Sequence, residues 1–286
     1  MPRSGTERAL ARVCEWGEAP ADAKRHGNRK VSKMMTEELL HAVMEIAQQM
    51  IEVGAEIHRV EESVTRVCNA YGVKRVDVYA TTSNVIVSVE NADGQLLTQT
   101  RRILQTGTDI ERLDRLNSLV RGMTAKKLSL EEVRESLGQI EKTPVYPLGV
   151  VILFYGVIAG SFCLFFGGQT VAECLVATIT GFLVGIMSWL ASNFMGNKLM
   201  GRFVCSAVAS ISAFTCYKLG MIPSVDNVII GNIMSLIPGI GLTNSLRDLF
   251  TGNSITGILR SIEALLLAVA IAGGYILTAY LFGGVL

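Results

Sequence analysis

The charged residues of this chain are divided very unevenly between its two halves. Among 286 residues there are 26 Lys and Arg and 25 Asp and Glu, but only five basic and four acidic residues follow Thr143. A transmembrane helix needs about 20 apolar residues at 1.5 Å rise each. Residues 143–286 are therefore predicted to form a bundle of about five transmembrane helices. The expected spans are 148–166, 171–190, 203–219, 227–242 and 256–282.

Small residues recur at four-residue spacing inside these runs. Such spacing lets helix backbones approach closely in a membrane, where the hydrophobic effect does not drive helices together. The pattern predicts a tightly packed bundle and says nothing about a ligand. The pairs are Gly156 with Gly160, Gly181 with Gly185, and Ala209 with Ala213.

The preceding part of the chain, residues 35–142, predicts a soluble α+β domain. Apolar side chains first recur at helical spacing in two segments, ended by Gly54 and Gly72, and then alternate as in strands. It is long enough to bury its own core. The expected features are a helix capped by Thr36, strands near 75–80, 85–89 and 96–102, a helix capped by Asp109, and a capping box formed by Ser129 and Glu132.

Residues 1–34 are expected to be a disordered basic tail. They contain eight Lys and Arg with little apolar periodicity, and no apolar core follows the charges as it would in a secretory signal. We expect the natural start to be Met34 or Met35, and a contact of this tail with anionic lipid is a second interpretation.

Several kinds of chemistry find no support in the sequence. The six cysteines form no Cys-x-x-Cys pair and the three histidines all lie in the first half, so neither disulfides nor a metal site is expected. A phosphate-binding Gly-x-x-x-x-Gly-Lys-Ser/Thr loop is absent from the sequence, which gives no support for ATP-driven transport. An intramembrane protease would need a serine activated by a histidine, or paired aspartates, and the predicted spans contain neither. We therefore expect a protein that is not an enzyme and has no cofactor.

The fourth apolar run is interrupted, and polar residues follow the interruption. Pro238, Gly239 and Gly241 break the helical pattern, because proline lacks a backbone donor and glycine permits irregular backbone. Charged groups and unpaired backbone persist in a membrane only where protein or a wet cavity receives them. The interruption is consistent with a transport site or with a simple turn between two spans.

The basic residues of the loops predict an orientation. Lys198 and Arg202 lie in one loop and Arg247 and Arg260 in another, and cytoplasmic loops are enriched in such residues. We expect the N-terminal domain in the cytoplasm and the C-terminus outside, in the inner membrane. Glu173 and Asp226 then lie at the outer ends, where we expect them to be solvated.

Three segments resemble the N-terminal part of the threonine/serine exporter family. They are GAEIHRVEESVTRVCNAYGV at 54–73, DIERLDRLNSLVRGM at 109–123 and SLIPGIGLTNSLRDLFTGNSITGILRSIEALLLA at 235–268. The resemblance extends from about residue 35 to the end. It implies a secondary exporter of small polar metabolites, such as threonine and serine or a dicarboxylate such as succinate.

Fused members of this family continue into a second membrane half, whereas this chain stops at Leu286. The resemblance therefore implies the larger subunit of a split, two-subunit transporter with a smaller membrane partner. The alternative is a membrane-anchored sensor or assembly protein without transport activity. A membrane tether needs no broken helix and no charge within the membrane, so these features favour the transporter. The sequence does not distinguish a carrier from a channel.

The candidate cargo site lies beside the interruption. A guanidinium suits a carboxylate-bearing cargo, since it offers a forked and permanently charged donor. Arg260 is the favoured receiver, Glu263 is expected to neutralise it, and Glu263 or Asp248 would accept a proton. The alternative is a purely structural Arg260–Glu263 pair. The substrate-binding residues are Asn244, Arg247, Asp248, Arg260 and Glu263, with a contribution from the exposed end of the half-helix after Pro238.

Overall fold

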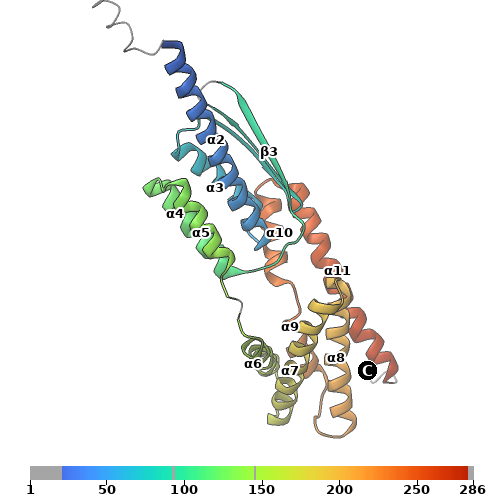
Figure 1. Ribbon diagram of the computed structural model, residues 1–286. Coiled ribbons are helices and arrows are strands. Elements are labelled where there is room, and N and C mark those ends of the chain that lie inside the picture. The colour runs from blue at the N-terminus through green and yellow to red at the C-terminus, as the bar shows by residue number, and fades with distance from the viewer. Residues whose placement is uncertain (1–20, 92–93, 145, 283–286) are drawn as a thin grey trace, which may run out of the picture. The chain divides into compact units, whose positions relative to one another are not determined.

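A computed structural model of the chain describes residues 21–91, 94–144 and 146–282, with side chains from Met34 onward. The chain divides into two compact units, Met1–Thr143 and Pro144–Leu286. Figure 1 shows the elements of each unit, and each unit is described here by itself.

The first unit is a three-stranded antiparallel sheet with helices packed on it. Helices α2 and α3 contact the strands, while α4 and α5 pack against the helices rather than against the sheet. The sheet order is β1-β2-β3. The elements are α2 (Ala21–Glu52), α3 (Ile57–Ala70), β1 (Arg75–Ala80), β2 (Asn84–Glu90), β3 (Leu96–Arg102), α4 (Ile110–Lys126) and α5 (Leu130–Glu141).

The central strand β2 supplies the sheet's share of the core. Val85, Val87 and Val89 are buried and alternate with partly exposed residues, as the sequence pattern predicts. Val87 pairs with Val78 and Val89 with Val76, so the apolar residues of β1 lie on the same face. That face is covered by α2 and α3, since the period of two residues directs alternate side chains to one side.

Helix termini in this unit follow the predicted caps except at the first helix. Asp109 accepts a hydrogen bond from the amide of Arg112, and Ser129 and Glu132 form the reciprocal capping box. Thr36, in contrast, lies inside α2, which already begins at Ala21. The residues before Thr36 include Ala, Lys and Arg, which favour helix without a cap at that position. Residues 21–34 are thus helical, and residues 1–20 of the expected tail lie outside the described residues.

Cys68 is a structural residue of the first unit's core. It lies on the buried face of α3, and burial raises the pKa of its thiol to about 12. The thiol therefore stays protonated and poorly nucleophilic. The five cysteines in the described part of the chain are all free thiols.

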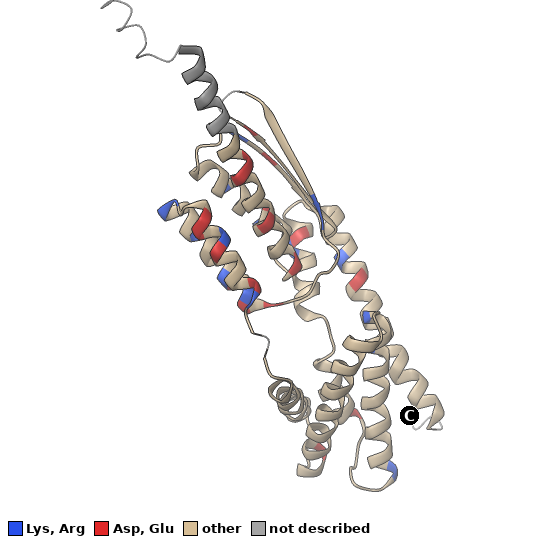
Figure 2. Cartoon of the chain, viewed as in Figure 1, with Lys and Arg blue, Asp and Glu red and all other residues tan. Residues whose placement is uncertain are grey.

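The second unit is helical throughout its described part and nearly uncharged, as Figure 2 shows. Four of its helices are long and apolar enough to cross a membrane, and a fifth span results if the bent pair α9 and α10 counts as one. These helices confirm the expected fold class. The elements are α6 (Leu148–Phe165), α7 (Val171–Phe194), α8 (Lys198–Lys218), α9 (Asp226–Met234), α10 (Gly239–Phe250) and α11 (Ser254–Leu281).

Glycines bring the backbones of α6, α7 and α9 into direct contact. A Cβ atom added at Gly181 would lie 2.7 Å from the carbonyl oxygen of Tyr155 and 2.8 Å from the Cα of Gly156. One added at Gly231 would lie 2.5 Å from the carbonyl oxygen of Ala159. The predicted small-residue packing is therefore present between α6 and α7, and α9 uses it as well.

Glu173 corrects one expectation of the sequence analysis. It is only 2% exposed, not solvated. Its carboxylate accepts hydrogen bonds from the amides of Gln169 and Thr170 and from the Thr170 hydroxyl, in a capping box at the start of α7. The carboxylate is thus satisfied by the backbone of the α6–α7 turn instead of by water.

The contact at Gly231 yields a stability prediction. Gly231→Ala should destabilise the detergent-solubilised protein by about 1–3 kcal/mol, because the new methyl group overlaps the backbone of α6. Gly149→Ala is the matched control, since a Cβ there meets nothing within 4 Å. Thermal unfolding of both variants checks this. Equal melting temperatures would show that α6 and α9 are not in backbone contact.

Candidate functional site

The break between α9 and α10 is a bend of 58° over four residues. Pro238 stands at the N-cap of α10 with ψ at 59°, and its side chain makes no capping hydrogen bond. Since proline has no N–H to continue the helical ladder, α9 ends and α10 starts in a new direction. The helix is therefore broken before α10, at the segment that ends in Pro238, whereas Gly239 and Gly241 lie in the first turn of α10 and not in the break.

Helices α10 and α11 form a tight hairpin after the break. Gly252 adopts a φ of +95° in the connecting turn, a conformation that glycine reaches without strain. Gly257 of α11 lies against α10, where a Cβ would be 2.8 Å from the amide nitrogen of Leu249 and 2.9 Å from the carbonyl oxygen of Ser245. This close approach brings the polar faces of the two helices together.

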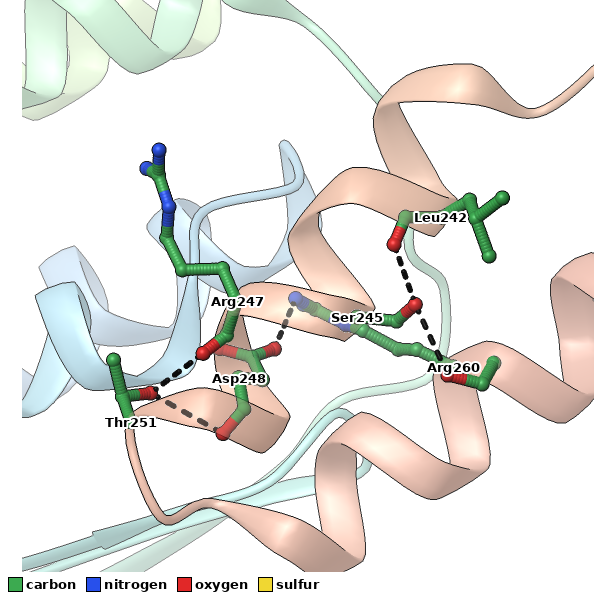
Figure 3. Close-up of polar contacts among 7 residues, drawn as sticks. Leu242, Ser245, Arg247, Asp248, Thr251 and Arg260 are labelled. Carbon is green, nitrogen blue, oxygen red and sulfur yellow. Dashed lines mark hydrogen bonds and ion pairs between the residues drawn. The ribbon is translucent and has the colours of Figure 1, made fainter.

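A buried ion pair joins the two helices of the hairpin (Figure 3). Nη1 of Arg260 donates to Oδ2 of Asp248 at 2.9 Å, and the two side chains are 12% and 1% exposed. A charge-assisted hydrogen bond in such a dry setting is stronger than an exposed one. Removal of one partner would leave the other charge buried, which is strongly destabilising.

Two serines extend the polar contact beside the ion pair. The Ser261 hydroxyl contacts the Ser245 hydroxyl at 3.1 Å, and Ser245 donates to the carbonyl oxygen of Leu242 at 2.7 Å. The sequence analysis did not single out either serine. The spacing held a signal for Ser245, which precedes Asp248 by three residues and so shares its helical face, but not for Ser261, which follows Arg260 directly.

The five predicted site residues do not all come together. Asp248 and Arg260 meet, whereas Glu263 is exposed, so Arg260 pairs with Asp248 rather than with Glu263. Asn244 is partly buried on α10. Arg247 is exposed, and its side chain points away from Arg260 in Figure 3.

The ion pair lies near one end of the helical bundle. Helices α8 and α11 are in register where Ser206 donates to the carbonyl oxygen of Ile271 at 2.6 Å. Arg260 is about 16 Å before Ile271 along α11, while the start of α8 is about 12 Å before Ser206, at 1.5 Å per residue. The ion pair is thus just beyond the level where α8 begins.

The N-terminus of α10 and the ion pair cannot bind the same carboxylate group. Asp248 is about 14 Å along α10 from Gly239, at 1.5 Å per residue. The sequence analysis placed the two features at one site, and the structure separates them by more than two helical turns. In the described residues, no group of three or more His, Cys, Asp or Glu side chains could hold a metal ion.

The fold and the hairpin together define a multi-pass helical membrane protein with a separate α+β unit and a broken helix ending in a buried ion pair. The family described as "Putative threonine/serine exporter" matches residues 41–282, and the chain belongs to this family. This is a family of transporters and not of enzymes.

The relatives fall into two groups that differ in how much of their own length this chain covers. The "Probable succinate transporter subunit YjjP" of Klebsiella aerogenes is 25% identical over 244 residues, which are 84% of this chain and 92% of the relative. The YjjP of Escherichia coli K12 is 25% identical over 82% of this chain and 91% of its own length. The "Threonine/serine exporter" of Corynebacterium glutamicum is 23% identical over 82% of this chain, but only 50% of the relative is covered.

The chain therefore spans nearly all of the subunit-type relatives and about half of the exporter. The "Probable threonine/serine exporter" of Mycobacterium tuberculosis gives the same result, with 47% of its length covered. This pattern matches the N-terminal subunit of a split transporter, as the resemblance implied. No solved structure matches the chain.

The ion pair yields a prediction that separates it from the other carboxylate of the hairpin. Asp248→Asn should destabilise the protein by about 3–5 kcal/mol, because the Arg260 guanidinium stays buried without its counter-charge. The double variant Asp248→Asn with Arg260→Gln should recover most of that loss. Glu263→Gln is the control and should change stability by less than about 0.5 kcal/mol, since Glu263 is exposed. Additive losses in the double variant, measured by thermal unfolding, would contradict the pairing.

Proposed function

We propose that this chain is one subunit of a secondary transporter that exports small carboxylate-bearing metabolites across the inner membrane. The cargo would be a threonine/serine-type amino acid or a dicarboxylate such as succinate. Membership of the family and the similarity to the YjjP succinate transporter subunits and to the threonine/serine exporters support this proposal. A membrane-anchored sensor or assembly protein would need neither the broken helix nor the buried ion pair.

The proposed partner is a smaller membrane subunit equivalent to the second half of the fused exporters. The half-length coverage of the exporters supports a second half, and the YjjP relatives are called subunits. Both observations concern relatives, so the complex has to be tested on this chain itself. Mild-detergent purification should recover a second membrane protein, and full export by this chain alone in proteoliposomes would contradict the proposal.

The observation that carries the proposed mechanism is the buried Asp248–Arg260 pair. Arg260 would receive the cargo carboxylate, so the cargo would compete with Asp248 for the same guanidinium. Protonation of Asp248 would release Arg260, because a neutral carboxyl group binds a guanidinium more weakly. Proton movement and cargo binding would then be coupled at one ion pair. Glu263 is exposed and is the weaker candidate for the proton acceptor.

Asn244 and Arg247 complete the proposed polar lining of the site on α10. Asn244 is one helical turn before Asp248, so it would reach a cargo held at Arg260 from the same face. Arg247 would act at a distance, by attracting anionic cargo toward this end of the bundle, since its side chain is exposed.

The function of Arg260 is tested by a change that keeps its charge. Arg260→Lys retains the cation but loses the forked donor, so the affinity for a carboxylate should fall by about tenfold while the protein still assembles. Cargo efflux measured at several concentrations separates affinity from maximal rate. An unchanged affinity in Arg260→Lys would exclude Arg260 as the receiver.

The proposed orientation places the N-terminal unit in the cytoplasm and the C-terminus outside. Gln169→Cys should react with a membrane-impermeant maleimide added outside, whereas Met195→Cys should not. Both side chains are exposed at opposite ends of α7, and Gly168 is unsuitable because a Cβ there would lie 2.8 Å from the carbonyl oxygen of Cys163. Labelling is measured against the wild-type cysteines. The reverse pattern would invert the topology.

A further inference from the structure

Arg202 is a second guanidinium that lies within the bundle. It is four residues after the start of α8, and its Nη1 atom is buried without a hydrogen-bond partner in the described part of the chain. Four residues correspond to about 6 Å of helix, a depth from which an arginine side chain easily reaches the membrane surface. The burial of Nη1 therefore means that the guanidinium is turned partly toward protein.

The direction of the side chain is set by its place on the helix. Arg202 precedes Cys205 by three residues and Ser206 by four, so the three share one face of α8. Cys205 belongs to a buried apolar cluster with Val184 of α7, Ile271 of α11 and Leu236, which lies between α9 and α10. That face of α8 is thus the face toward the point where three other segments converge.

Leu236 connects this point to the helix break. It is fully buried and is the second residue before Pro238. Arg202 lies one turn before Cys205, and side chains of a helix lean toward its N-terminus, so Arg202 points toward the end of the bundle where α8 begins. Arg202 is therefore on the face of α8 whose next turn packs in the same cluster as Leu236, just before the break.

Among the described residues Arg260, unlike Arg202, has a protein counter-charge. Arg260 is neutralised by Asp248 at 2.9 Å, and Lys218, at the far end of α8, lies over the ring of Phe282 at 4.9 Å. Arg202 is only partly buried, but its Nη1 is a buried donor atom without an acceptor in the described chain, which is costly, and charged groups in membrane segments mark substrate pathways. The unmet donor of Arg202 consequently points to an anionic acceptor that binds there.

We propose that Arg202 is a binding residue for the carboxylate of the cargo at the broken segment, separate from the Asp248–Arg260 pair. This inference rests on the proposed export function and adds a second contact for the same class of cargo. Cargo can bind Arg202 without first displacing a protein carboxylate, whereas Arg260 requires Asp248 to let go. Arg202 would then hold the anion before or while the ion pair opens.

The test compares Arg202→Gln, Arg202→Lys and the control Lys198→Gln, which removes a positive charge from the same end of the same helix. Thermal stability of the purified protein is measured with and without succinate, L-threonine and dimethyl succinate, which has no carboxylate. Uptake of succinate and L-threonine is measured in everted membrane vesicles that contain the complete transporter.

Arg202→Gln should leave the cargo-free protein as stable as the wild type or more stable, because it removes a partly buried charge whose Nη1 has no acceptor within the described residues. It should abolish stabilisation by the cargo acid and raise the KM about tenfold or more, as expected for loss of a charged hydrogen bond. Arg202→Lys should lie between Arg202→Gln and the wild type. Lys198→Gln should keep the wild-type KM.

Three results would overturn the inference. A less stable cargo-free Arg202→Gln protein with an unchanged KM would make Arg202 structural. Equal stabilisation by dimethyl succinate would exclude a carboxylate, and stabilisation through Arg202 by phosphatidylglycerol alone would assign it to a lipid phosphate. If the wild type takes up neither acid but is still stabilised by one through Arg202, the proposed export fails while the binding residue stands.

Discussion

The packing of the membrane unit depends on places where a backbone touches another backbone without a side chain between them. In lipid the hydrophobic effect does not hold helices together, so close van der Waals contact has to do so. Gly181 and Gly231 provide it among α6, α7 and α9, and Gly274 provides it between α11 and α8, where a Cβ would lie 2.4 Å from the carbonyl oxygen of Phe203. Because these contacts tolerate no added atom, they fix the helices in register. The polar groups of the bundle are positioned by that register.

A glycine contact also joins α10 and α11, where it brings an ion pair together. Gly257 allows α11 to lie on α10, and the ion pair then closes the contact one turn further along. Two charges near the end of an apolar bundle are stable there because they satisfy each other, and Ser245 and Ser261 bond to each other alongside. The Asp248–Arg260 pair therefore holds α10 and α11 together.

The sequence predicted what depends on local pattern. The strands, the caps at Asp109 and Ser129, and the apolar runs follow from periodicity and capping chemistry, which act within a few residues. Thr36 failed as a cap because the residues before it also favour helix, so a suitable capping residue did not define the true start. Glu173 was misjudged because a carboxylate at a helix start can bond to its own turn as readily as to water.

The residues of the candidate site stay a prediction, but the expected partner of Arg260, Glu263, was wrong. Arg260 and Glu263 are neighbours along the sequence, but the partner of Arg260 is decided by the face of α10 that Gly257 covers. That choice is a tertiary contact between residues twelve apart, and helical spacing within one element contains no information on it. The sequence likewise could not predict that Nη1 of Arg202 is buried without a partner in the part of the chain that the structure describes, because basic residues in a loop between spans indicate only the orientation of the helices.

Helix α11 is continuous for 28 residues, and this gives the hairpin a mechanical property. Its second half contacts α8 at Gly274, while its first part supports α10, which packs mainly against α11 within this unit. The distance from Gly274 to Arg260 is about 21 Å at 1.5 Å per residue. A tilt of about 10° around Gly274 would therefore move Arg260 by about 4 Å, and α10 with it. The break at Pro238 would absorb this displacement, so α11 would act as a lever with its pivot at Gly274 and its long arm ending at the ion pair.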